Sequence, residues 1–128
     1  MRRIVIGLVL ASGLVASPAL ATRPTVRTLP RLREPPLARQ IARHFPERAK
    51  QDGVSGWAVV VCRISERGKV SACVARTQAP QGYGFGEAAL ALITELRFVP
   101  GTIDGSPIEG EITVPIDFSG PPGPHPKP

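Results

Sequence analysis

Residues 57–76 read WAVVVCRISERGKVSACVAR, and this stretch decides the fold. β-Branched residues fill Trp57 to Ile64, and a second such run extends from Val70 to Arg76. Gly68 marks a turn between the two runs, so the stretch predicts a β-hairpin. Both faces of the first run are mostly apolar, which is typical of a central strand more than of an edge strand.

The hairpin also carries both cysteines of the sequence. A two-residue turn at Arg67-Gly68 sets Cys62 opposite Cys73, within disulfide reach. If Gly68 instead forms a bulge, the register shifts by one residue and Cys62 meets Ala72. In an oxidising compartment an even pair favours a disulfide, and the alternative is two buried thiols acting as small hydrophobes.

Downstream of the hairpin, the sequence predicts one helix. Gln78 to Gly84 is rich in turn formers, and Glu87 to Arg97 is rich in alanine and leucine. Apolar residues recur at helical spacing and predict a face that packs on the sheet: Phe85, Ala89, Leu92 and Leu96.

A last strand is expected from Glu111 to Phe118, after the turn-rich segment Gly101 to Gly110. Its apolar residues alternate and point to one face: Ile112, Val114, Ile116 and Phe118. Pro115 has no amide hydrogen for a ladder and predicts an edge strand. The crossover helix allows this strand to lie on the far side of the first one.

Upstream of the hairpin, residues 22–36 contain four prolines among arginines and are interpreted as an extended linker. A short helix is expected over Leu37 to His44. A second helix begins at Phe45-Pro46 and ends at Gly53, which suits a left-handed C-terminal residue. After Ser119 the chain continues as GPPGPHPKP, a composition typical of an extended tail.

The first 21 residues have the features of a secretory signal. Arg2 and Arg3 precede the apolar run Ile4 to Val15, and Ala19-Leu20-Ala21 is a small-residue cleavage site. Cleavage after Ala21 leaves 107 of the 128 residues, enough for one modest core, and lowers the net charge from +6 to +4. The prediction is a periplasmic protein, or an inner-membrane-anchored one if the signal stays uncleaved.

Basic residues concentrate at the start of the predicted mature chain. Between Thr22 and Lys50 there are eight basic residues against Glu34 and Glu47. An exported protein meets anionic lipids and polymers far more often than nucleic acid, so no nucleic-acid partner is expected. A solvated basic linker remains the plain alternative.

No catalytic constellation is recognisable in the sequence. Neither His44 nor His125 lies in a structured segment with a nearby carboxylate, and no serine has a recognisable partner. Two cysteines and two remote histidines do not form a zinc pattern. We therefore expect no enzyme activity, no cofactor and no metal site.

Taken in order, these elements and their residues resemble the TonB carboxy-terminal domain family. The matching pieces span residues 45–118: Phe45-Pro46-Glu47-Arg48-Ala49, Gly53 to Gly56, Gly68-Lys69-Val70, Phe85, Glu87-Ala88-Ala89-Leu90, Arg97-Phe98-Val99-Pro100 and Gly110 to Phe118. The resemblance implies an α+β fold in which a three-stranded antiparallel sheet of ββαβ order packs against a helix, with a short preceding helix. The domain organisation is then a signal peptide (1–21), a basic proline-containing linker (22–44), the TonB-like domain (45–118) and a proline-rich tail (119–128). Full TonB proteins carry a membrane anchor and a long spacer, so the short linker here predicts a stand-alone periplasmic form.

The resemblance also implies a function. TonB domains capture an extended peptide of outer-membrane transporters beside their last strand, which here is the edge formed by Thr113, Val114, Pro115, Ile116 and Asp117. The expected partner is an outer-membrane TonB-dependent receptor or another envelope protein, and the domain could also form a homodimer. The alternative is a structural cell-envelope protein that its basic N-terminal arm holds to anionic surface polymers.

Overall fold

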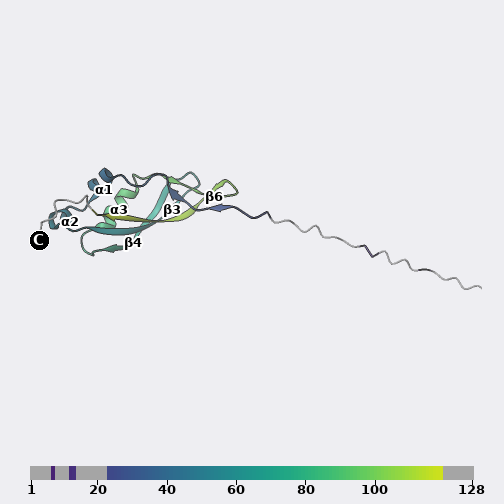
Figure 1. Ribbon diagram of the computed structural model, residues 1–128, viewed down its shortest axis with the longest axis horizontal. Helices are drawn as coiled ribbons and strands as arrows, with labels where there is room; N and C mark the ends of the chain where they lie inside the picture. The colour runs from purple at the N-terminus through teal and green to yellow at the C-terminus, as the bar shows by residue number, and fades with distance from the viewer. Residues whose placement is uncertain (1–6, 8–11, 14–22, 120–128) are drawn as a thin grey trace, which may run out of the picture.

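Strand β3 (Gly56–Ile64) lies in the centre of the main sheet, as its two apolar faces predict. It pairs antiparallel with β4 (Val70–Ala79) on one side and with β8 (Gly110–Phe118) on the other, in the order β4-β3-β8 (Figure 1). Helix α3 (Phe85–Ile93) packs on one face of the sheet, against β3 and β4. This computed structural model describes residues 7, 12, 13 and 23–119. The predicted signal sequence and the tail beyond Ser119 fall almost entirely outside the described residues.

The core lies between α3 and the sheet. The alternating residues of β3 and β8 that face α3 are buried, as the period of two predicts: Ala58, Val60, Cys62, Ile64, Ile112, Val114, Ile116 and Phe118. From the helix, Phe85, Ala89, Leu92 and Ile93 complete it. The predicted α+β fold with a three-stranded antiparallel sheet is confirmed.

Two short helices precede the sheet and close one end of the core. α1 (Ala38–His44) and α2 (Glu47–Asp52) are separated by Phe45 and Pro46, and Gly53 ends α2 with a φ of 65°. Both helices and the left-handed glycine agree with the sequence prediction. The Phe45 ring lies edge-on to Phe85 and to Phe118, each at 6.0 Å between centroids. An aromatic cluster therefore ties the loop between α1 and α2 to the helix and to the last strand.

The hairpin turn differs from the predicted two-residue turn. Ile64 pairs with Val70, and Ser65 donates its backbone N–H to the carbonyl of Lys69 at 2.8 Å, so Ser65 and not Glu66 faces Lys69. Three residues therefore span the turn, with Gly68 at a φ of 78°. This is the bulge alternative. A two-residue type I′ turn would require a positive φ at Arg67 as well as at Gly68, whereas the observed turn requires it at glycine alone.

A second irregularity restores the cysteine register. Ala72 has a φ of 48°, and the register shifts by one residue there, between the pairs Arg63 with Ser71 and Val61 with Val74. The turn shifts the register by one residue, and the irregularity at Ala72 shifts it back by one. Cys73 and not Ala72 therefore lies beside Cys62. The Cα atoms of the two cysteines lie 4.1 Å apart and their sulfur atoms are bonded. The disulfide that the sequence favoured is present, by a different route from the one predicted.

Two predicted boundaries were wrong. β4 extends to Ala79 and not to Arg76, because Trp57, Ala58 and Val59 continue the pairing through a further register shift. Helix α3 ends at Ile93 and not at Arg97. The residues after it form β5 (Phe98–Val99), so strand pairing prevails over the helix propensity of the preceding sequence.

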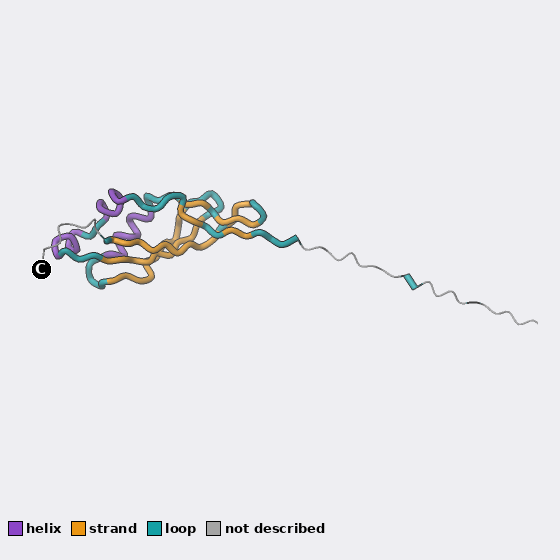
Figure 2. The backbone as a smooth tube through the Cα atoms, in the orientation of Figure 1, coloured by secondary structure: helices purple, strands orange, loops and turns teal. Residues whose placement is uncertain are grey.

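Short strands occupy segments that the sequence analysis treated as irregular. β1 (Arg27–Thr28) pairs with β6 (Gly101–Ile103), and β2 (Arg31–Leu32) pairs with β5, so part of the predicted linker lies against the domain. β6 also pairs with β7 (Ser106–Ile108) in a small hairpin near the end of the domain where the N-terminal segment arrives (Figure 2). Asp104 and Gly105, with φ of 49° and 83°, form its turn. This hairpin was not predicted, although the Asp-Gly pair is a sequence signal for such a turn.

Candidate functional site and family membership

The outer edge of β8 is the candidate site. Among the described strands β8 pairs with β3 alone, over nine residue pairs from Gly110 with Ile64 to Phe118 with Gly56. The backbone groups that point away from β3 therefore have no strand beside them in the described part of the chain. Such a row of donors and acceptors is a template for another extended segment.

Pro115 indicates which backbone groups point outward. It lies opposite Val59 in an uninterrupted register, and a proline fits a ladder only where its missing N–H would face away from the neighbouring strand. Because the direction alternates along a strand, the N–H groups of Thr113 and Asp117 also face outward. The outer edge then offers N–H and C=O groups at Thr113 and Asp117, and only a carbonyl at Pro115.

The five predicted edge residues separate into two sets. Val114 and Ile116 are each 1% exposed and face α3, whereas the side chains of Thr113, Pro115 and Asp117 are exposed on the opposite face of the sheet. The Asp117 carboxylate accepts a hydrogen bond from the Ser119 backbone N–H at 2.8 Å, which fixes the end of the strand. The edge is therefore held in place from the core side.

The open face of the sheet beside this edge also belongs to the candidate site, although its residues are not among those predicted from the sequence. Trp57 pairs with Asp117, Val59 with Pro115 and Val61 with Thr113, so each of these three β8 residues has an apolar neighbour on β3. Trp57 is 46% exposed, and Val74 of β4, opposite Val61, is 56% exposed. The alternation within 57–63 was the available signal, because it already placed these apolar side chains on one face.

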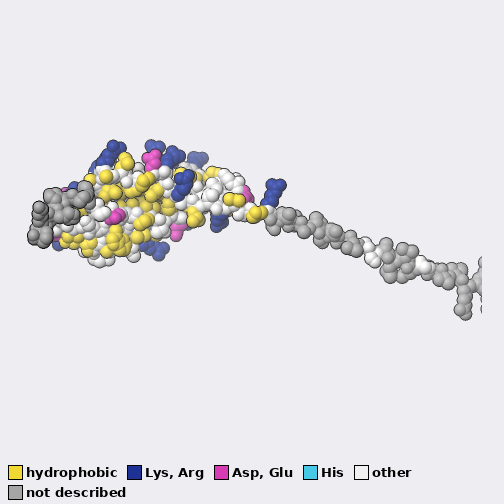
Figure 3. All heavy atoms as spheres, in the orientation of Figure 1, with side chains coloured by type: hydrophobic (Ala, Val, Ile, Leu, Met, Phe, Trp, Pro, Cys, Tyr) yellow, Lys and Arg dark blue, Asp and Glu magenta, His cyan; other side chains and the backbone are white. Residues whose placement is uncertain are grey.

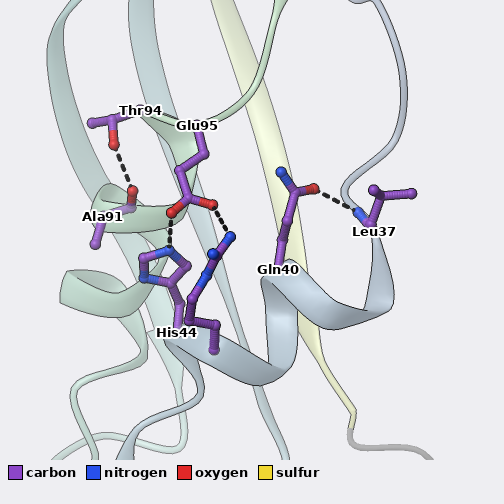
Figure 4. A network of polar contacts seen from close by, with 7 residues as sticks. Leu37, Gln40, His44, Ala91, Thr94 and Glu95 are labelled. Atoms are coloured by element: carbon purple, nitrogen blue, oxygen red, sulfur yellow. Dashed lines mark hydrogen bonds and ion pairs between the residues drawn. The ribbon is translucent and has the colours of Figure 1, made fainter.

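Charged groups surround the domain, and most are basic on the face drawn in Figure 3. One acidic group has a structural role: the Glu95 carboxylate accepts hydrogen bonds from His44 Nε2 at 2.8 Å and from Arg43 Nη2 at 2.9 Å, which connects α1 to the segment after α3 (Figure 4). The expectation that His44 has no carboxylate near it in a structured segment was therefore wrong, because the fold brings Glu95 to the end of α1. The bond from His44, more than the nearby Arg43, holds the pKa of Glu95 below its usual value, against a smaller opposing effect of burial.

A second polar contact connects α2 to the loop before α3. The Tyr83 hydroxyl donates to the Asp52 carboxylate at 3.1 Å, and the Arg48 guanidinium lies 5.5 Å from the centroid of the Tyr83 ring. The hydrogen bond to Asp52 is the main reason that the pKa of Tyr83 is raised. Both contacts join α2 to the loop before α3, and neither involves a residue of β8.

Comparison with known families gives a match over most of the domain. The model for "Gram-negative bacterial TonB protein C-terminal" matches residues 41–119, more than half of the chain. The chain belongs to the TonB C-terminal family. The match extends from within α1 to the residue after β8, so it includes the whole main sheet and the candidate edge. No curated protein matched the chain.

TonB C-terminal domains are non-enzymatic energy-transducer and protein-interaction domains of the cell envelope. Within residues 23–119, no group of three or more His, Cys, Asp or Glu side chains is placed to hold a metal ion. No helix built from the described residues is both long and apolar enough to cross a membrane. The family match makes the chain a TonB-like protein-interaction module of the envelope.

Proposed function

We propose that the outer edge of β8 captures an extended peptide of a protein partner by strand addition. The observation that carries the proposal is that β8 pairs with β3 on one side and with no other described strand. Pro115 lies at a position where its missing N–H does not interrupt the hydrogen bonds to β3. The partner is an outer-membrane TonB-dependent transporter or another envelope protein. The protein reaches it in the periplasm after export by the signal sequence in residues 1–21.

The proposed contacts give affinity and selectivity separately. Main-chain bonds to Thr113 and Asp117 supply sequence-independent affinity, at about 1 kcal/mol net for each bond. The incoming strand places alternate side chains over the open face, beside the exposed side chains of Thr113, Pro115 and Asp117. Those side chains, with the carbonyl-only position at Pro115, select among peptides.

Site-specific photocrosslinking tests where the partner binds. A photoreactive residue at Thr113 or Asp117 should capture a partner in the envelope of the native host, whereas one at Arg67, in the hairpin turn, should not. Removal of residues 121–128 then examines the tail, which follows β8 directly. Stronger capture means that the tail competes for the edge, and equal capture means that it does not.

A pair of substitutions tests the mechanism. Thr113→Pro removes one outward N–H and should leave the β3 ladder intact, because residue 113 shares the phase of Pro115. It should weaken capture by about fivefold, the value of one hydrogen bond. Thr113→Val keeps the N–H and should bind normally. If Thr113→Val weakens capture as much as Thr113→Pro, the partner reads the side chain and strand addition is the wrong mechanism.

An absence of crosslinks at every position on the edge would favour the second reading of the sequence. The domain would then be a structural envelope protein, held to anionic polymers by its basic N-terminal arm, the linker of residues 22–44. The described part of that arm exposes Arg23, Arg27, Arg31 and Arg33.

A further inference from the structure

A basic cleft lies at the hairpin-turn end of the sheet, away from the Thr113 to Asp117 edge. It has a volume of about 590 Å³, which is within the range of roughly 300–1,000 Å³ that is typical of small-ligand sites. Four cationic residues from three separate segments line it: Arg33, Arg67, Lys69 and Arg97. Val70 and Phe98 contribute apolar surface, and none of the described residues that line the cleft is acidic.

The four cations are not neutralised by ion pairs to described residues. Within the described residues none of their side chains forms an ion pair or a hydrogen bond, although Arg43, Lys50 and Arg63 elsewhere on the domain each pair with a glutamate. Clustered like charges oppose folding, so the fold gains nothing from bringing them together. An anion in the cleft would offset this repulsion.

The backbone holds the cleft in one shape. Arg33 donates its N–H to the Arg97 carbonyl at 2.8 Å, next to the pairing of β2 with β5. In the turn, Ser65 Oγ accepts hydrogen bonds from the backbone N–H groups of Arg67 and Lys69, at 3.2 and 3.1 Å. The cationic side chains thus extend from an ordered frame, which lowers the entropic cost of binding.

The chemistry of the lining favours a phosphate over an acidic peptide. Guanidinium groups donate in a planar fork that matches phosphate oxygens, and three of the four cations are arginines. The backbone N–H groups of Arg33, Arg67, Gly68 and Lys69 are already hydrogen-bonded inside the domain. An extended peptide would find little free backbone to pair with, so the cleft must recognise its ligand through side-chain charge.

We propose that this cleft binds phosphate groups, carried by an anionic lipid headgroup or by a soluble phosphate compound. The site is separate from the β8 edge and does not depend on strand addition there. It lies at the end of the sheet where Ile64 pairs with Gly110, whereas β8 finishes at the opposite end beside Gly56. A phosphate ligand and a peptide partner can therefore occupy the domain together.

The test uses the purified protein and two phosphate probes. Calorimetric titration with inorganic pyrophosphate measures the soluble form, and co-sedimentation with phosphatidylglycerol/phosphatidylcholine vesicles measures the headgroup form, with pure phosphatidylcholine vesicles as the blank. Arg67→Ala/Lys69→Ala should weaken binding of the responding probe by about tenfold or more. Arg97→Ala, outside the turn, should weaken it in the same direction.

A charge-matched variant is the control. Arg39→Ala/Arg76→Ala removes the same charge from exposed residues of α1 and β4 that do not line the cleft, and it should bind like the parent protein. Equal losses in both double variants would mean diffuse electrostatic attraction and would overturn the proposal. The proposal would also be overturned if neither probe binds. Tighter binding of a hexaglutamate peptide than of pyrophosphate would overturn it as well, and would make the cleft a peptide site.

Discussion

Gly68 packs so closely against Phe98 that a Cβ atom on Gly68 would lie 2.6 Å from the backbone carbonyl oxygen of Phe98. The contact joins the hairpin turn to β5, and Gly68 also has a φ of 78°. Two independent constraints therefore require glycine at this position. The backbone oxygen cannot move aside as the end of a flexible side chain could.

Gly68→Ala should lower the free energy of unfolding by about 3 kcal/mol or more, from backbone strain together with the steric clash. Gly105→Ala is the matched control, because Gly105 has a φ of 83° but an added Cβ there meets nothing within 4 Å. It should cost only about 1–2 kcal/mol. Urea denaturation of both variants measures the difference, and equal losses would show that the contact with Phe98 contributes nothing.

Reduction of the Cys62–Cys73 disulfide should destabilise the domain. The bond closes a loop between residues 11 apart in sequence, and loop-closure entropy for that length is worth about 2–3 kcal/mol. Urea midpoints measured with and without reductant should differ accordingly. The Cys62→Ala/Cys73→Ala protein should show no response to reductant, and a parent protein that is equally unresponsive would argue against the bond.

Truncation of Phe118 should be among the most damaging core changes. Its side chain is fully buried and lies against both Phe45 and Phe85. Phe118→Ala should cost about 3–5 kcal/mol, against about 0.5–1.5 kcal/mol for Ile112→Val near the other end of the same strand. Thermal and urea unfolding measure both, and similar values for the two variants would contradict the cluster's role.

Stability should decline in acid partly through Glu95. Its folded-state pKa is lowered, so the contribution is present above the unfolded pKa of about 4.3 and is lost as the pH falls through the folded value. The difference in unfolding free energy between the parent protein and Glu95→Gln should therefore shrink as the pH falls from neutral. In a His44→Ala background the dependence should be weaker, because the hydrogen bond to His44 is its main cause. If the difference in unfolding free energy between the parent protein and Glu95→Gln does not change with pH, Glu95 is not a source of the acid sensitivity.

The main sheet could be predicted because the distribution of apolar residues extends along the whole length of its strands. The strict alternation of Ile112, Val114, Ile116 and Phe118 follows from the burial of one face of β8, and the two apolar faces of β3 follow from its central position in the sheet. Pro115 predicted that β8 lies at the edge of the sheet, because proline has no amide hydrogen to give to a second neighbouring strand. These signals place the candidate edge without knowledge of the tertiary structure.

The irregular features could not be predicted in the same way. Ala72 has a φ of 48° although alanine has no local preference for that region, so the register shift beside Cys73 depends on tertiary packing. The early end of α3 depends on the pairing of β5 with β2, whose paired residues lie 66 and 68 positions apart in sequence. The basic cleft could not be predicted from the sequence, because its four cations come from separate segments that only the folded chain brings together.

The two ladders of β3 differ in how they resist force. The ladder to β4 contains two register shifts, and a covalent bond between Cys62 and Cys73 crosses it. The ladder to β8 has no shift and no cross-link, and its nine pairs run from one end of the strand to the other. A pull along the axis of β8 loads all of these pairs together in shear, whereas a pull across the sheet opens them one after another from an end. The domain is therefore strong toward tension along its last strand and weak toward peeling of that strand, and the disulfide keeps the remaining hairpin joined if β8 is pulled away.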